Sequence, residues 1–285
     1  MRSCLSDEAI NRLVEEDVPY IDLTTFGLGI NERQGTLEFY TRHPMTVCGT
    51  EEAADVFRKC GAVAQFSVKS GSRVASDRLI LRATGNAGAL HAGWRVALNL
   101  LEYASGIATR TAELVETVKK VSPATSVVTT RKIFPGTKAM MIKAIIAGGA
   151  FPHRLGLSDT ILVFKQHLVY LGGFSKFLER IAEFRQKFQG RKITVEVDSV
   201  KDAWNLAEAG VDIIQMDKVP LPELAAFVPA FKQRYPMIPR LAAAGGITRE
   251  NVKEYAALGV DLLVTSSPYS GKPADIAARM IPLEA

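Results

Sequence analysis

The stretch that decides the fold is Val127-Val128-Thr129-Thr130-Arg131-Lys132-Ile133-Phe134-Pro135-Gly136. Its apolar start predicts a buried β-strand, and Pro135-Gly136 predicts a turn that leads into a helix. Arg131 and Lys132 stand at the point where the strand ends. Because the carboxyl ends of parallel strands open onto one mouth, two fixed positive charges at this point suit an anionic ligand.

Further strand-like segments follow and alternate with helical patterns. The expected strands are Thr125–Thr130, Thr160–Phe164, Lys192–Val197, Val211–Met216, Ile238–Ala244 and Val260–Thr265. The expected helices are Thr137–Ala147, Lys176–Phe188, Val200–Ala209, Leu221–Arg234 and Thr248–Leu258. In Ala209–Asp212 and Leu258–Asp261 a glycine follows a helix directly before a strand, as in β/α units. Serial parallel units form a barrel or a doubly wound sheet, and we favour an open β/α barrel because no dinucleotide-binding glycine fingerprint opens the first unit.

The first hundred residues show a different pattern. Two helices and three separated strands are expected there, at Ser6–Glu16, Glu51–Lys59, Leu37–Tyr40, Ala62–Lys69 and Leu79–Thr84. A long helical section, 88–121, follows, and Gly106 and Thr109 suggest a break inside it. We therefore expect an α/β protein with an N-terminal α/β sandwich domain at 1–104, to which the tail 272–285 returns. The catalytic domain is then the open β/α barrel at 105–271.

Composition restricts the function classes. The chain has 285 residues, of which 47% are hydrophobic and 23% charged, as in ordinary folded proteins. No apolar run is long enough for a membrane span, and the three cysteines show no metal-ligand spacing, so we expect reduced thiols in a cytoplasmic protein. A formal charge of +5, with no basic run and no interleaved aromatic residues, argues against nucleic acid and is compatible with small anionic ligands.

Polar residues or glycines mark the end of nearly every expected strand after the first. They are Lys165, Glu196, Asp217 and Gly245-Gly246, while His153 and Arg154 lie in a proline-containing loop before Thr160–Phe164 and add a second cationic pair. For any one of them the alternative is a loop residue that faces solvent. Taken in series they predict one mouth lined by cations and carboxylates, because the ends of parallel strands converge.

Glu196 is the most informative of these acids. In Thr194-Val195-Glu196-Val197-Asp198, alternation puts Glu196 on the opposite face from the two valines. An acid in so apolar a strand is costly to bury unless it binds a metal, a cation or hydroxyl groups. Together with Asp217 it suits a largely hydrated Mg²⁺ or ribose hydroxyls. Gly245 and Gly246 form either a tight turn or a backbone N–H site for phosphate.

Two cations leave alternatives open. Lys165 is a candidate anion contact or, if it is desolvated, a Schiff-base amine as in a barrel aldolase. Arg95 lies beside the helical stripe of Trp94, Leu98 and Leu101, and from its position alone it is a solvated or interface arginine.

The motifs resemble those of the quinolinate phosphoribosyltransferases, also called nicotinate-nucleotide pyrophosphorylases, over nearly the whole chain and in the same order. The matching pieces are Asp22–Thr25, Arg95–Asn99, Ser105–Thr109, Thr130–Lys132 with Pro135-Gly136, His153–Asp159, Val195–Val197 and Met216-Asp217. Within that family the opening Asp17–Asp22 resembles the ModD branch, which is associated with molybdenum transport.

The resemblance implies a phosphoribosyltransferase that uses phosphoribosyl pyrophosphate with Mg²⁺ and acts as a homodimer or a higher oligomer. By position, Arg131, His153 and Arg154 bind the carboxylates of the acceptor, and Lys132 and Lys165 contact acceptor or phosphates. The same carry-over gives Glu196 and Asp217 the ribose hydroxyls and the metal, and it makes Lys132, Glu196 and Asp217 the catalytic residues. It places Gly245, Gly246 and Ser266 in the phosphate pocket and Arg95 in the site of the neighbouring subunit.

The sequence departs from the family pattern at several of these places. Trp94 stands where a glutamate is usual, Ala244 where a serine precedes the glycines, and Ser266 where a glycine ends the last strand. Lys218 replaces a frequent asparagine after Asp217. These changes put quinolinate itself in doubt more than transferase chemistry. A non-catalytic anion-binding protein in molybdenum handling, built on the same scaffold, is the alternative.

Overall fold

The computed structural model describes residues 1–283, and the chain in it divides into two compact units. The sandwich unit contains Met1–Ala112, Ile133–Gly149 and the chain from Pro268 onward. The half-barrel unit contains Glu113–Lys132 and Ala150–Ser267. The sequence-based boundary between residues 104 and 105 therefore falls inside a helix that both units share, and residues 133–149 group with the N-terminal part of the chain.

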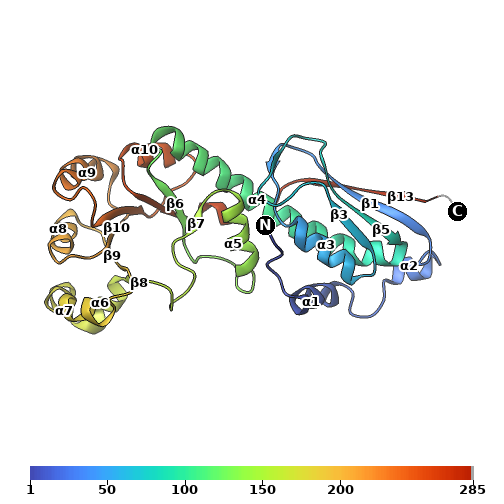
Figure 1. Ribbon diagram of the computed structural model, residues 1–285, viewed down its shortest axis with the longest axis horizontal. Helices are drawn as coiled ribbons and strands as arrows, with labels where there is room; N and C mark the ends of the chain where they lie inside the picture. The colour runs from blue at the N-terminus through green and yellow to red at the C-terminus, as the bar shows by residue number, and fades with distance from the viewer. Residues whose placement is uncertain (284–285) are drawn as a thin grey trace. The chain divides into compact units, whose positions relative to one another are not determined.

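The sandwich unit is built on a four-stranded antiparallel sheet in the order β13-β1-β5-β3 (Figure 1). Its strands are β1 (Gln34–Thr41), β3 (Val63–Phe66), β5 (Leu79–Asn86) and β13 (Ile276–Pro282). The other elements are α1 (Asp7–Asp17), α2 (Leu23–Gly27), α3 (Thr50–Lys59), α5 (Lys138–Ala147) and the two-residue strands β2 (Met45–Thr46) and β4 (Arg73–Val74). The chain thus returns at its C-terminal end to pair with β1, in antiparallel register from Gly35 opposite Pro282 to Thr41 opposite Ile276.

One hydrophobic core joins this sheet to α3 and to α4 (Ala87–Val121). Phe39 on β1 and Phe57 on α3 are both fully buried, and Leu101 of α4 joins the same cluster. Their alternate spacing on the strand and helical spacing on the helices put them on one side of each element.

The half-barrel unit contains a seven-stranded parallel sheet in the order β7-β6-β12-β11-β10-β9-β8. Its strands are β6 (Ser126–Thr129), β7 (Phe151–Pro152), β8 (Ile161–Val163), β9 (Ile193–Val197), β10 (Ile213–Asp217), β11 (Arg240–Ala244) and β12 (Leu262–Thr265). Its helices are α6 (Lys165–Leu171), α7 (Phe174–Lys187), α8 (Val200–Glu208), α9 (Leu221–Arg234) and α10 (Val252–Ala257), followed by the short 3-10 helix η1 (Ser267–Tyr269). Figure 1 shows α7, α8 and α9 in a row outside the strands. The predicted class, an α/β protein with an N-terminal sheet domain and an open barrel, is confirmed.

The two faces of the parallel sheet differ. Val195, Ile214 and Met216 are almost fully buried and alternate with residues of the other face. That other face carries a small cluster of Val128, Ala242, Ala244 and Val264, with Ile213 and Leu262 against it. Glu196 and Asp217 share this second face by alternation. Asp217 on β10 is in register with the small Ala244 on β11, and Glu196 is in register with Gln215.

Two predictions about helices are wrong. The long helix α4 runs without a break through Gly106 and Thr109. Gly106 is glycine because a Cβ there would lie 3.0 Å from the backbone of Ala274 and of Lys272, so it permits close packing. The helix expected from Thr248 begins instead at Val252, because the Thr248 N–H donates to the side chain of Asn251 in a turn that precedes it.

Several elements were not expected. They are α2, α6, the short strand β7 and the C-terminal strand β13. Within residues 1–283 no helix is long and apolar enough to cross a membrane.

Candidate functional site

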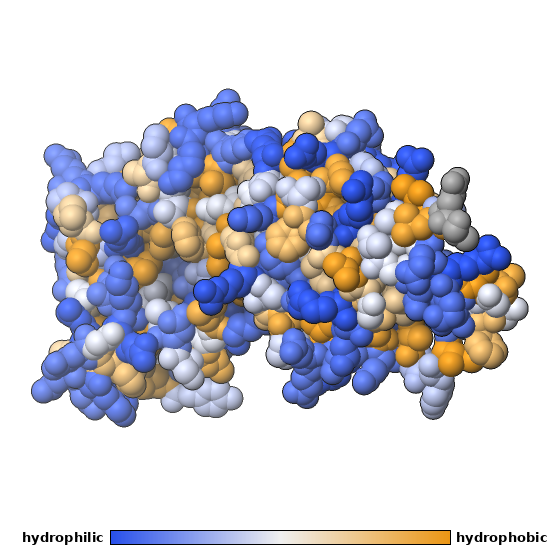
Figure 2. Space-filling model, turned by 45° about the vertical axis from the view of Figure 1, so that its right-hand side comes forward, coloured by the Kyte–Doolittle hydropathy of each residue, from blue (hydrophilic) through white to orange (hydrophobic). Residues whose placement is uncertain are grey.

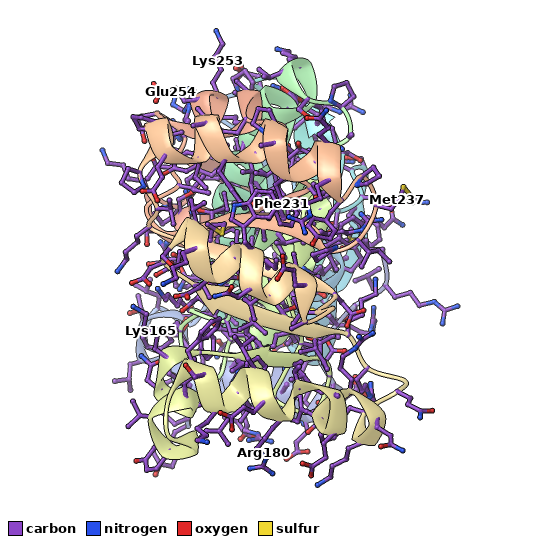
Figure 3. The ribbon with its side chains drawn as sticks, turned by 90° about the vertical axis from the view of Figure 1, so that its left-hand side faces the viewer. Lys165, Arg180, Phe231, Met237, Lys253 and Glu254 are labelled. Carbon is purple, nitrogen blue, oxygen red and sulfur yellow. The ribbon has the colours of Figure 1, made fainter. Side chains whose placement is uncertain are left out.

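The strand ends of the half-barrel unit bring most of the predicted residues to one side of the sheet. Lys165, at the first position of α6, marks this side in Figure 3, and Met237, in the loop before β11, lies on the opposite side where strands begin. Arg131 and Lys132 follow β6, His153 and Arg154 follow β7, and Glu196 and Asp217 lie in the last two residues of β9 and β10. Gly245-Gly246 and Ser266 follow β11 and β12. These residues therefore lie at one edge of the parallel sheet, the edge where its strands end.

A carboxylate pair with an amide between its members lies at the centre of this mouth. Glu196 and Gln215 are in register across β9 and β10, and Gln215 Nε2 donates a hydrogen bond of 2.6 Å to Glu196 Oε2. Asp217, two residues further on, lies on the same face. Gln215 is 4% exposed, and its Oε1 is buried with no hydrogen-bond partner among the described residues.

Burial and the nearby Asp217 carboxylate raise the pKa of Glu196. The hydrogen bond from Gln215 and the charges of Lys132 and Lys218 act in the opposite direction. A carboxylate whose ionisation is disfavoured by a second carboxylate beside it is stabilised by a bound cation. In the described chain no group of three or more His, Cys, Asp or Glu residues could hold a metal ion.

The cations after β6 and β7 form one electropositive group. The pKa of Arg154 is lowered by burial and by the charge of Arg131, which shows that the two guanidinium groups are near each other. Arg154 is 8% exposed, and its guanidinium lies 5.7 Å from the ring centre of Phe164. The pKa of His153 is lowered by burial and by Arg154, so its ring is neutral near pH 7, and its Nε2 is buried without a partner among the described residues. Arg131 and Lys132 themselves are exposed and carry no ion pair within that part of the chain.

Lys165 differs from the other cations because it is paired. It forms a salt bridge with Asp198, and both side chains are more than half exposed. The hydrogen bond that Lys165 Nζ donates to the Asp198 carboxylate raises the pKa of Lys165, so its amine stays protonated. A Schiff-base lysine requires the opposite shift. The structure therefore speaks against an aldolase role for this residue.

The glycines after β11 have the backbone geometry of a tight turn. Gly245 and Gly246 both have positive φ, +90° and +73°. A Cβ on Gly245 would lie 2.4 Å from Lys218 Cγ and 2.9 Å from Asp217 Oδ1, so only glycine fits beside the end of β10. Ser266 is partly buried directly after β12.

Arg95 belongs to the sandwich unit. It is exposed on α4, and its guanidinium lies 5.5 Å from the ring centre of Trp94. A contact to a neighbouring subunit stays a prediction.

Three residues of the mouth were missed by sequence reasoning as site residues. Gln215 was counted as part of an apolar strand, Asp198 was not paired with Lys165, and Lys218 was noted only as a departure from the family pattern. The alternation that singled out Glu196 also singles out Gln215, because both are polar residues at inward positions of buried strands.

A half-barrel whose strand ends carry arginines, lysines and a carboxylate pair defines a protein that handles polyanionic ligands. Comparison with known proteins makes the class specific. Residues 22–105 match the family described as quinolinate phosphoribosyl transferase, N-terminal domain, and residues 107–279 match its C-terminal domain. The chain belongs to the quinolinate phosphoribosyl transferase family.

Individual relatives agree with this assignment. The chain is 40% identical to a protein of Rhodobacter capsulatus named "Putative pyrophosphorylase ModD", over 87% of this chain and 94% of that protein. It is 28% identical to the human nicotinate-nucleotide pyrophosphorylase (carboxylating), over 89% and 84% of the two chains. The crystal structure of NadC from Streptococcus pyogenes superposes with a TM-score of 0.86 at 27% identity and covers 98% of this chain and 97% of that one. Family and fold together support a phosphoribosyltransferase.

Proposed function

We propose that this protein transfers a phosphoribosyl group from phosphoribosyl pyrophosphate to a ring nitrogen of quinolinate or of a related heteroaromatic carboxylate. Pyrophosphate is released, and CO₂ follows if the acceptor is quinolinate. The observation that carries the proposal is the pair Glu196 and Asp217 at the mouth, with the cations Arg131 and Lys132 at the ends of the same sheet.

The charges of the mouth suit this reaction. As the bond from the anomeric carbon to pyrophosphate breaks, positive charge develops on the sugar, and carboxylates on one side stabilise it. Two polyanionic reactants repel each other unless cations hold them, which Arg131, Arg154 and Lys132 are placed to do. His153 is neutral and suits a hydrogen bond to the acceptor rather than a charge contact. Little proton transfer is needed in this reaction.

Mg²⁺ is the cofactor that we propose, with Glu196 and Asp217 as its residues. When bound it would neutralise the phosphates of the leaving group. The carboxylates would share their remaining oxygens with the ribose hydroxyls. Lys165 would contact phosphate or acceptor from the edge strand, and Gly245, Gly246 and Ser266 would hold a phosphate through backbone N–H groups and a hydroxyl.

We propose a homodimer in which Arg95 completes the neighbouring site. In support, large hydrophobic side chains are exposed on α2 and directly before and after it, namely Tyr20, Ile21, Leu23, Phe26 and Leu28. Figure 2 shows hydrophobic colour gathered at this end of the sandwich unit. An exposed patch of this kind favours a protein partner.

The test is release of pyrophosphate from phosphoribosyl pyrophosphate with Mg²⁺, measured over a panel of pyridine and azole carboxylates. Turnover with at least one acceptor is expected, and no release of pyrophosphate with any acceptor of the panel would contradict the proposal. Calorimetry with molybdate examines the alternative of a non-catalytic anion-binding protein. Retention of Glu196 and Asp217 argues against that alternative, because carboxylates repel an oxyanion.

A further inference from the structure

Lys218 has an unusual backbone conformation at the mouth. Its φ is +57°, and among the described residues only Asp77 shares such a value without being glycine. The left-handed region is costly for a long side chain and is tolerated best by glycine and asparagine. A lysine kept there, at the end of β10 and beside Asp217, is an outlier that points to a function.

The position of the Lys218 side chain is determined by its neighbours. Its backbone N–H donates to the carbonyl oxygen of Ala244 at 2.9 Å, which ties the end of β10 to the end of β11. Its Cγ occupies the space that a Cβ on residue 245 would fill, because the two positions are 2.4 Å apart. The aliphatic part of Lys218 therefore lies over Gly245, the first of the two glycines proposed for phosphate.

The charge of Lys218 is available for a ligand. No carboxylate lies within 4.0 Å of its amine in residues 1–283, whereas Lys165 on the same side of the sheet is paired with Asp198. The charge of Lys218 lowers the pKa of Glu196, which shares this side of the sheet. An exposed ammonium group on a stem that packs beside Gly245, with no carboxylate in salt-bridge range, is suited to a phosphate group.

We propose that Lys218 and Gly245 together bind one phosphate group of the sugar-phosphate substrate, and that Lys218 is a specificity-determining residue of this site. The proposal rests on the proposed function for the identity of the substrate, but the anion-binding property can be measured without turnover. A neutral asparagine at this position would keep the backbone conformation and lose the charge.

The experiment measures the binding of pyrophosphate and of ribose 5-phosphate to the full chain by titration calorimetry, with and without Mg²⁺. The variants are Lys218→Asn and Lys218→Arg, and the control is Lys253→Gln. Lys253 is exposed on α10 of the same unit, and Figure 3 shows it projecting outward. Loss of one charge-assisted hydrogen bond predicts about tenfold to hundredfold weaker binding by Lys218→Asn, with Lys218→Arg and Lys253→Gln near the wild type. The probe whose affinity falls identifies which phosphate of the substrate is bound.

The outcomes separate this inference from the proposed function. Selective loss in Lys218→Asn supports the inference whether or not turnover is found. Unchanged binding of both probes in Lys218→Asn overturns it even if the enzyme is active. Failure of the wild type to bind either probe overturns both. Misfolding is excluded by thermal melting, since asparagine in the left-handed conformation is expected to leave Tm unchanged or higher.

Discussion

Replacement of Gln215 by methionine is expected to move the acidic limb of the pH profile of kcat/KM to higher pH. In the wild type, burial and Asp217 raise the pKa of Glu196, and the hydrogen bond from Gln215 Nε2 opposes that rise by stabilising the carboxylate. Methionine fills a similar volume but donates nothing, so the protonated form of Glu196 is favoured further. The ionised form that binds a cation is then reached only at higher pH.

The magnitude follows from the geometry of that contact. A hydrogen bond to a charged group contributes about 1.5–3 kcal/mol, which corresponds to about tenfold to hundredfold in kcat/KM on the acidic limb. Well above the limb the loss is smaller, because Glu196 is ionised in both proteins. The free energy of unfolding of Gln215→Met is expected to stay close to that of the wild type, because the variant also removes Gln215 Oε1, which is buried without a partner among the described residues.

The assay is pyrophosphate release as a function of pH, at several concentrations of phosphoribosyl pyrophosphate, with the acceptor saturating. Gln189→Met, at an exposed turn position shortly after α7 and outside the mouth, is the matched control. A Gln215→Met profile that superimposes on the wild type would refute the reasoning, and so would a uniform loss at all pH values, which indicates a packing defect instead.

Three further outcomes are expected. Arg131→Ala should raise the KM of the acceptor by about tenfold to hundredfold, with little change in binding of the sugar phosphate; an unaltered acceptor KM would contradict its role. Glu196→Gln should weaken Mg²⁺ binding in calorimetry and raise Tm at neutral pH. Because the pKa of Glu196 is raised in the folded protein, its ionisation lowers the stability of the wild type as pH rises, and glutamine removes that loss. A lower Tm of the variant at neutral pH would contradict this. Lys143→Met should lower the free energy of unfolding in urea by about 3–5 kcal/mol, because Lys143 is buried between Glu51 and Glu52. The control Lys138→Met, at an exposed position, should change it little. Equal stabilities of the two variants would contradict a stabilising role of this ion cluster.

Local patterns predicted much of the site. The alternation of Val195, Glu196 and Val197 is a property of one strand, and so is the position of Arg131 and Lys132 after an apolar run. Both patterns can be recognised in the sequence alone, because they depend on which residues of a single strand are buried. The break predicted in α4 failed for the opposite reason: Gly106 is explained by the backbone of 272–274, which lies far away in the chain and packs against it.

The sequence by itself determined the β/α order of the half-barrel, the family pattern and the residues that stand at each strand end. Only the tertiary structure decided which of them meet. Three contacts join residues on, or next to, different strands: the hydrogen bond from Gln215 to Glu196, the salt bridge of Lys165 with Asp198, and the packing of Lys218 over Gly245. Such contacts depend on strand register and on backbone conformation, which no single segment encodes. The physical reason is that a charge's partner is set by distance in space, whereas a pattern records only distance along the chain.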